Sequence, residues 1–72
     1  MTYDASDKQA AFWWWMRHRR QNLFVSQIEL AAVIGVNQTL ISKYEKGVNR
    51  IPESRMAEIE EALEQFERMT VK

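Results

Sequence analysis

The residues that end and begin helices constrain this chain most. It contains only two glycines, Gly35 and Gly47, and a single proline, Pro52. Glycine ends helices because it enters the left-handed conformation without a Cβ penalty, whereas proline suits the first turn of a helix. So few turn-forming residues give little support to a β-rich architecture. The sequence therefore predicts an all-α fold in which short helices end at the two glycines and a long helix begins near Pro52.

The size of the chain and its lack of cysteine limit it to one small core. A chain of 72 residues buries only roughly 60% of its unfolded surface, so we expect one domain over residues 1–72. Without cysteine, neither a disulfide framework nor a thiolate metal site is available. No apolar run approaches the roughly 18 residues of a membrane span, and residues 1–8 are unlike a signal peptide. We therefore expect a cytoplasmic protein with no membrane partner.

Capping residues predict where the helices begin. Asp7 is expected to cap a first helix that Asn22 ends in the left-handed conformation. Ser26 and Glu29 have the spacing of a capping box, which would start a second helix that ends at the first glycine. Asn37 is expected to cap a third helix that ends at the second glycine.

A narrow apolar seam predicts that the last helix runs from about 52 to 69. Glu53 suits the positive end of the dipole of this helix. Spacings of three and four residues alternate along the seam, which consists of Met56, Ile59, Leu63, Phe66 and Met69.

The net charge is zero, but the charges are unevenly distributed along the chain. Residues 17–50 carry six basic and two acidic side chains, whereas residues 51–72 carry three basic and six acidic ones. Such a dipolar molecule can present a basic face to phosphates while its acidic tail points away. Alternatively, both sets of charges only solvate helix surfaces.

Several requirements of a known fold coincide between residues 26 and 47. The segment contains Ser26-Gln27-Ile28-Glu29-Leu30-Ala31, then Gly35-Val36, Gln38 and Ile41-Ser42-Lys43-Tyr44-Glu45-Lys46-Gly47. In these residues the chain resembles phage repressor and Cro proteins, also called Xre-type helix-turn-helix proteins, and the resemblance extends over about residues 16–63. It implies a lambda-repressor-like helix-turn-helix domain of four to five helices, with the helix-turn-helix unit at about 26–47. The apolar seam adds an extended C-terminal helix to this domain.

The resemblance makes the third helix the recognition helix. An α-helix fits the major groove, where each base pair presents a distinct pattern of donors, acceptors and methyl groups. Gln38 can pair with adenine, Thr39 can contact a thymine methyl group, and Lys43 can reach guanine acceptors. The residues expected to contact DNA from this helix are Asn37, Gln38, Thr39, Ser42 and Lys43.

Four further residues are expected to contact DNA phosphates without reading sequence. Gln27 lies at the start of the second helix, where the resemblance implies a phosphate contact. Lys46, Asn49 and Arg50 follow the recognition helix. The alternative for each of the four is ordinary solvation at the surface.

Arg20 and Glu45 occupy positions that form an ion pair in similar repressors. That pair would connect the first helix to the end of the third. The competing interpretation places Arg20 on a phosphate together with Arg17 and Arg19. We favour the ion pair, because nothing else in the neighbouring sequence explains an acidic residue at position 45.

The chain departs from the family pattern in its apolar residues. Phe24 stands where the pattern usually has glycine, and the usual fifth helix is replaced by a continuation of the fourth. Three consecutive tryptophans point in different directions around the first helix, so a small core cannot bury them all. We expect a homodimer interface that consists of Trp13, Trp14, Phe66 and Met69. The alternatives are a tryptophan surface for another protein, or a fourth helix that folds back over the tryptophans.

No enzymatic constellation is present in the sequence. His18 is the only histidine, and no cysteine or serine matches it as nucleophile and base. The glutamates of the C-terminal segment resemble a solvated helix face more than a catalytic or metal-binding pair. We therefore expect no enzyme activity, no cofactor and no metal site.

Together these features predict a sequence-specific DNA-binding transcriptional regulator. The resemblance favours a repressor that binds a palindromic operator in double-stranded DNA as a homodimer. One alternative is a protein-interaction module, such as the antitoxin of a toxin–antitoxin pair. Another is an adaptor that has kept the fold and lost DNA reading.

Overall fold

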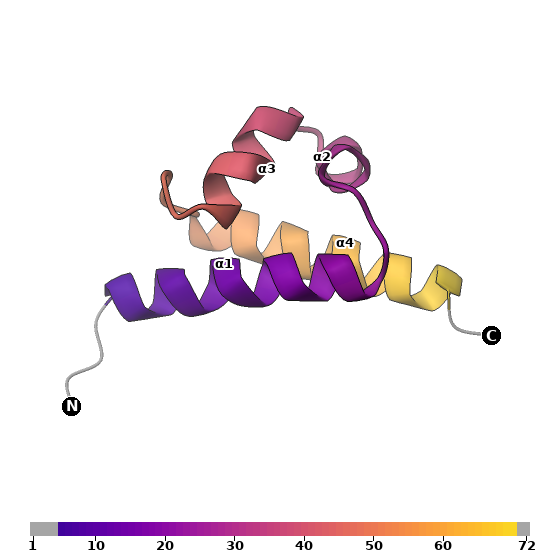
Figure 1. The fold of residues 1–72 in the computed structure, drawn as a ribbon, viewed down its shortest axis with the longest axis horizontal. Coiled ribbons are helices and arrows are strands. Elements are labelled where there is room, and N and C mark those ends of the chain that lie inside the picture. The colour runs from indigo at the N-terminus through magenta and orange to yellow at the C-terminus, as the bar shows by residue number, and fades with distance from the viewer. Residues whose placement is uncertain (1–4, 71–72) are drawn as a thin grey trace.

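The computed structural model describes the backbone of residues 5–70 and the side chains of residues 8–69, and these residues form four α-helices and no β-strand (Figure 1). The helices are α1 (Ala5–Asn22), α2 (Gln27–Ile34), α3 (Gln38–Glu45) and α4 (Glu53–Thr70). The prediction of an all-α helix-turn-helix fold is therefore confirmed.

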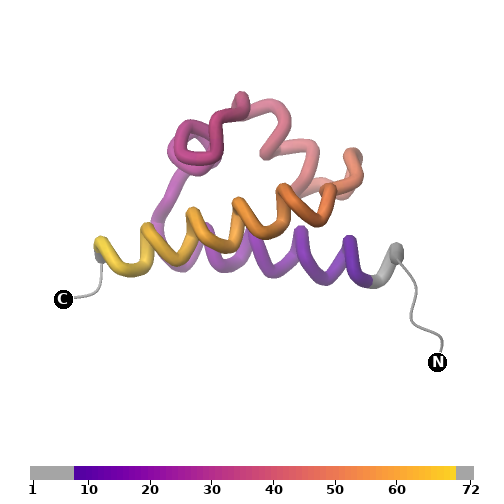
Figure 2. The backbone as a smooth tube through the Cα atoms, turned by 180° about the vertical axis from the view of Figure 1, so that it is seen from behind, coloured from indigo at the N-terminus to yellow at the C-terminus, as the bar shows by residue number. Residues whose placement is uncertain are grey.

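The two long helices α1 and α4 lie side by side and run in the same direction, and α2 and α3 cover one side of the pair (Figures 1 and 2). Lys8 Nζ lies 3.0 Å from Glu53 Oε2 near the start of both helices, and Arg19 pairs with Glu67 near their ends. The hydrogen bond and charge of Lys8 hold the pKa of Glu53 below its usual value. The parallel pair is thus connected by ion pairs at both ends.

The ends of α2 and the start of α3 follow the capping residues. Ser26 Oγ accepts a hydrogen bond from the backbone N–H of Glu29 at 3.0 Å, and Glu29 Oε1 accepts one from the N–H of Ser26 at 2.8 Å. This is the predicted capping box. Gly35 ends α2 with a φ of 78°, and Asn37 Oδ1 accepts from the N–H of Leu40 at 2.9 Å.

The first helix differs from the prediction at both ends. It begins at Ala5, so Asp7 lies inside α1 and is not its N-cap. Asn22 is the last helical residue, and the left-handed residue is Phe24, with a φ of 58°. Phe24 N–H donates to Gln21 O and Val25 N–H donates to Arg20 O, which is a Schellman turn with phenylalanine at the usual glycine position.

A single cluster of buried side chains joins all four helices. Each fully buried aliphatic side chain contributes about 1.5–3 kcal/mol, so this cluster supplies most of the driving force for folding. Its members are Met16, Val25, Leu30, Ala31, Ile41, Tyr44, Ile51, Met56, Ile59, Ala62 and Leu63.

The three tryptophans have different surroundings. Trp13 packs against the core, and its ring lies beside Gly47. Trp14 is 57% exposed, and Trp15 lines a hollow between α1 and α4. Phe66 also packs against the core of its own chain, whereas Met69 is exposed. Of the four residues expected at a dimer interface, Trp13 and Phe66 therefore have partners within the chain, while Trp14 and Met69 lie on the surface.

Gly47 is predicted to tolerate alanine less well than Gly35. Both glycines have a positive φ, and alanine costs roughly 1–2 kcal/mol in that conformation. A Cβ at Gly47 would also lie 3.1 Å from Trp13 Nε1, whereas a Cβ at Gly35 would meet nothing within 4 Å. Urea unfolding should give a larger loss of stability for Gly47→Ala than for the control Gly35→Ala. Equal losses would show that the Trp13 ring does not restrict this position.

Candidate nucleic-acid interface

Helix α3 is fixed by one face and exposes the other. Ile41 and Tyr44 are buried in the core, which leaves the opposite side of the helix towards solvent. Ser42 is half-buried at the edge of that side. The residues exposed on or just beyond the helix are Gln38, Thr39, Lys43 and Lys46. Short polar and basic side chains on an exposed helix suit the donor and acceptor pattern of the major groove.

A buried ion pair connects α1 to the end of α3. Arg20 Nε donates to Glu45 Oε2 at 2.7 Å and Arg20 Nη2 donates to Glu45 Oε1 at 2.9 Å, so the pair is bidentate. Arg20 Nη1 also donates to the carbonyl of Val25 at 2.8 Å. The side chains of the pair are only 11% and 4% exposed. In this structure Arg20 is therefore engaged within the fold, while Arg17 remains exposed.

The ion pair continues through hydrogen bonds to the exposed face of α3. Gln27 Nε2 donates to Glu45 Oε1 at 3.0 Å, and Gln38 Nε2 donates to Gln27 Oε1 at 3.2 Å. An ionised carboxylate only accepts hydrogen bonds, so Glu45 requires the amide nitrogen of Gln27 to face it. The amide oxygen of Gln27 then faces Gln38 and sets the orientation of that amide as well.

A hollow of about 240 Å³ lies beside this chain of hydrogen bonds. It is bordered by two exposed cations, Arg17 of α1 and Lys46 at the end of α3. The complete lining is Arg17, Arg20, Gln21, Gln27, Ser42, Glu45 and Lys46. Sequence reasoning did not assign Gln21 to DNA, and it placed Arg17 on a phosphate only in the competing interpretation for Arg20. The sequence feature that points to Arg17 is its spacing, because a residue three positions before Arg20 lies on the same face of the helix.

The other predicted contact residues lie at the two ends of α3. Asn37 uses its side-chain oxygen to cap the helix, and both N–H groups of its amide remain for a ligand. Asn49 is half-buried and Arg50 is exposed in the connection between α3 and α4. The exposed cations Arg17, Lys46 and Arg50 thus come from three different segments of the chain.

Among the described residues, no cluster of three or more histidine, cysteine, aspartate or glutamate side chains has the geometry of a metal site. None of the helices in that part of the chain is long and apolar enough to cross a membrane.

His18 lies against the exposed Trp14 ring, with 4.0 Å between the ring centroids.

Comparison with known proteins agrees with the helix-turn-helix arrangement of α2 and α3. A helix-turn-helix family model matches residues 16–65. The chain is 48% identical over 48 residues to an uncharacterised transcriptional regulator in the ATPase CF(0) region of Rhodospirillum rubrum, covering 67% of this chain and 44% of the relative. It is 44% identical over 48 residues to the uncharacterised HTH-type transcriptional regulator y4wC of Sinorhizobium fredii, covering 67% of this chain and 34% of the relative. The chain thus spans less than half the length of these curated relatives, and no solved structure matches it.

Removing either partner of the buried ion pair is predicted to destabilise the fold strongly. Arg20→Ala leaves the Glu45 carboxylate buried without its counterion, and Glu45→Ala does the same to the guanidinium. Each single variant should lose about 3 kcal/mol, and the double variant should lose less than the sum.

Urea unfolding measures these losses. The exposed pair Arg55 and Glu58, with 2.7 Å between Nη1 and Oε1, is the matched control. Its alanine variants should each cost less than about 1 kcal/mol. Small, additive losses for the buried pair would contradict the structure.

Proposed function

The chain belongs to the helix-turn-helix family, and on that premise we propose that it is a transcriptional repressor that binds a palindromic DNA operator as a homodimer, with α3 in the major groove. The observation that carries this proposal is the hydrogen-bonded connection from the buried ion pair to Gln38. It supports a preorganised amide on the exposed face of a helix that is otherwise anchored in the core.

Gln38 has the groups needed to read adenine. One N–H of its amide is used by Gln27, which leaves a second N–H and the carbonyl oxygen. Adenine offers an acceptor at N7 and a donor at N6 in the major groove, so these two groups form a bidentate pair. The fixed orientation of Gln27 reduces the freedom that Gln38 would lose on binding.

The neighbouring side chains complete the proposed reading surface. Thr39 would contact a thymine methyl group, and Lys43 would reach the acceptors of guanine. Ser42 and the amide of Asn37 supply further hydrogen-bonding groups. Direct contacts from a few side chains specify sequence, whereas the rest of the interface determines how the protein lies on the duplex.

Phosphate contacts are proposed around the reading helix. Arg17 and Lys46 border the hollow next to Gln27, and Arg50 and Asn49 lie beyond the end of α3. Contacts from both sides of the helix would fix its register in the groove. Neutralised phosphates release counterions, so this part of the affinity is expected to fall with salt.

A homodimer is proposed because one recognition helix reads only a few base pairs. Two copies related by a two-fold axis read two half-sites about one helical turn apart. The exposed apolar side chains Trp14 and Met69 are the strongest candidates for the contact between copies, because Trp13 and Phe66 already pack within the chain.

Sequence reading and phosphate contact are predicted to separate in alanine variants. Gln38→Ala should weaken binding to a site selected from random DNA by about 1–3 kcal/mol and barely change binding to unrelated DNA. Arg50→Ala is the matched control, because it should weaken binding to every sequence and reduce the slope of log affinity against log salt by roughly one. Equal losses on selected and unrelated DNA for Gln38→Ala would refute the proposal that α3 reads the bases.

The homodimer is predicted to depend on Trp14 and Met69. Sedimentation of the wild-type protein without DNA should show a dimer at micromolar concentration, and a Trp14→Glu, Met69→Glu variant should be a monomer, because charges buried at a symmetric interface have no partner. Glu60→Gln is a control that should remain dimeric. A wild-type monomer would refute the dimer and favour the alternative in which the exposed tryptophan binds another protein.

A further inference from the structure

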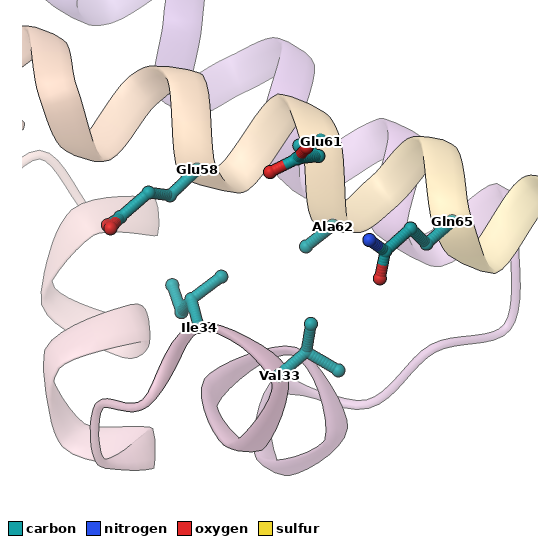
Figure 3. A pocket seen from close by; sticks show the side chains of 6 residues that line it. All are labelled: Val33, Ile34, Glu58, Glu61, Ala62 and Gln65. Carbon is teal, nitrogen blue, oxygen red and sulfur yellow. The ribbon is translucent and has the colours of Figure 1, made fainter.

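A second surface, separate from the α3 face, lies where α2 crosses α4 (Figure 3). It is a hollow of about 230 Å³, called here the α2–α4 groove. Its lining residues are Val33 and Ile34 of α2 and Glu58, Glu61, Ala62 and Gln65 of α4. Figure 3 shows the side chains of the two helices facing each other across the hollow.

The groove combines an apolar floor with an acidic wall. Val33 is 49% exposed on α2, half-buried Ile34 lies next to it, and the buried Ala62 of α4 lies at the base of the groove. Glu58 and Glu61 provide carboxylates along the α4 side. An exposed aliphatic side chain next to carboxylates is suited to a ligand that is apolar at one point and cationic beside it.

The acidic character extends beyond the groove. A neighbouring hollow on α4 is lined by Ala57, Glu58, Glu60, Glu61 and Glu64. Glu58 pairs with Arg55, and Glu64 lies 3.6 Å from Arg68, but within the described residues no cation pairs with Glu60 or Glu61. This surface therefore has a net negative charge, and DNA phosphates would be repelled from it.

We propose that the α2–α4 groove is a docking site for a segment of a second protein in which an apolar side chain lies between lysines or arginines. The apolar side chain packs against Val33 and Ile34, and the cations pair with Glu58 and Glu61. Charge complementarity selects this occupant, because Glu61 pairs with no cation within the described residues and its carboxylate would repel an acidic segment.

The position of the groove leaves the proposed DNA-reading face free. Gln27, at the start of α2, takes part in the hydrogen-bonded connection to Gln38, whereas Val33 and Ile34 lie at the other end of α2 and face α4. A protein bound in the groove does not displace Gln27 or Gln38. The docking site thus goes beyond the proposed repressor activity, because the partner would be held on DNA by the same chain.

The test uses the whole chain and a defined probe. The probe is a short capped peptide with two leucines between pairs of lysines, titrated into ¹⁵N-labelled protein without DNA. Amide shifts are expected at Val33, Ile34, Ala62 and Gln65. Two control peptides, one with glutamate for lysine and one with serine for leucine, should cause no shifts there.

Matched variants show which side chains of the groove contribute to the peptide affinity. Glu61→Gln should weaken the peptide affinity by about three-fold, as loss of an exposed ion pair does. Val33→Thr keeps the shape of the side chain and should weaken it by about four-fold through the lost apolar contact. Glu60→Gln removes the same charge from the same helix outside the groove and should change the affinity by less than two-fold.

Three outcomes would overturn the docking site. One is the absence of shifts at the groove up to millimolar peptide. Another is an equal effect of Glu60→Gln and Glu61→Gln, which would show general attraction to an acidic helix. The third is a monomer–dimer equilibrium that changes with Glu61→Gln, because the groove would then hold a second copy of this chain. Since the titration contains no DNA, its result is independent of whether α3 reads an operator.

Discussion

The ion pair between Arg20 and Glu45 is the interaction on which the rest of the structure depends. It removes two charges from water, and that cost is offset only because each nitrogen of the guanidinium has an acceptor. The same carboxylate accepts from Gln27. The first, second and third helices are therefore held in one relative position, and a shift of any of them would misplace the amide of Gln38.

Local sequence signals predicted the helix-turn-helix elements well, because a capping box and a left-handed glycine act within a few residues. The sequence prediction was wrong at both ends of the first helix. The helix begins at Ala5, before Asp7, and the left-handed residue after its end is Phe24, in a Schellman turn, and not Asn22. The sequence also did not predict which of the three tryptophans packs against the core. Trp13 is fixed by its contact with Gly47, which is distant along the chain.

The site shows the same division between local and distant interactions. The partners Arg20 and Glu45 were expected from a family resemblance, and both lie in the buried pair. The hydrogen bonds of Gln27 depend on how α2 crosses α3, so periodicity did not predict them. The uneven charge of the sequence becomes a spatial separation, with Arg17 and Lys46 next to the hydrogen-bonded chain and the glutamates of α4 along another surface.

Phe24 holds a conformation that costs a residue other than glycine roughly 1–2 kcal/mol, and its side chain is 92% exposed. It belongs neither to the buried core nor to the exposed face of α3. The strained backbone at Phe24 therefore lowers the stability of the fold. A substitution at this position can remove the strain without altering the residues proposed to read DNA. A lineage that moves to a warmer habitat therefore has a route to a higher melting temperature that leaves the exposed face of α3 unchanged.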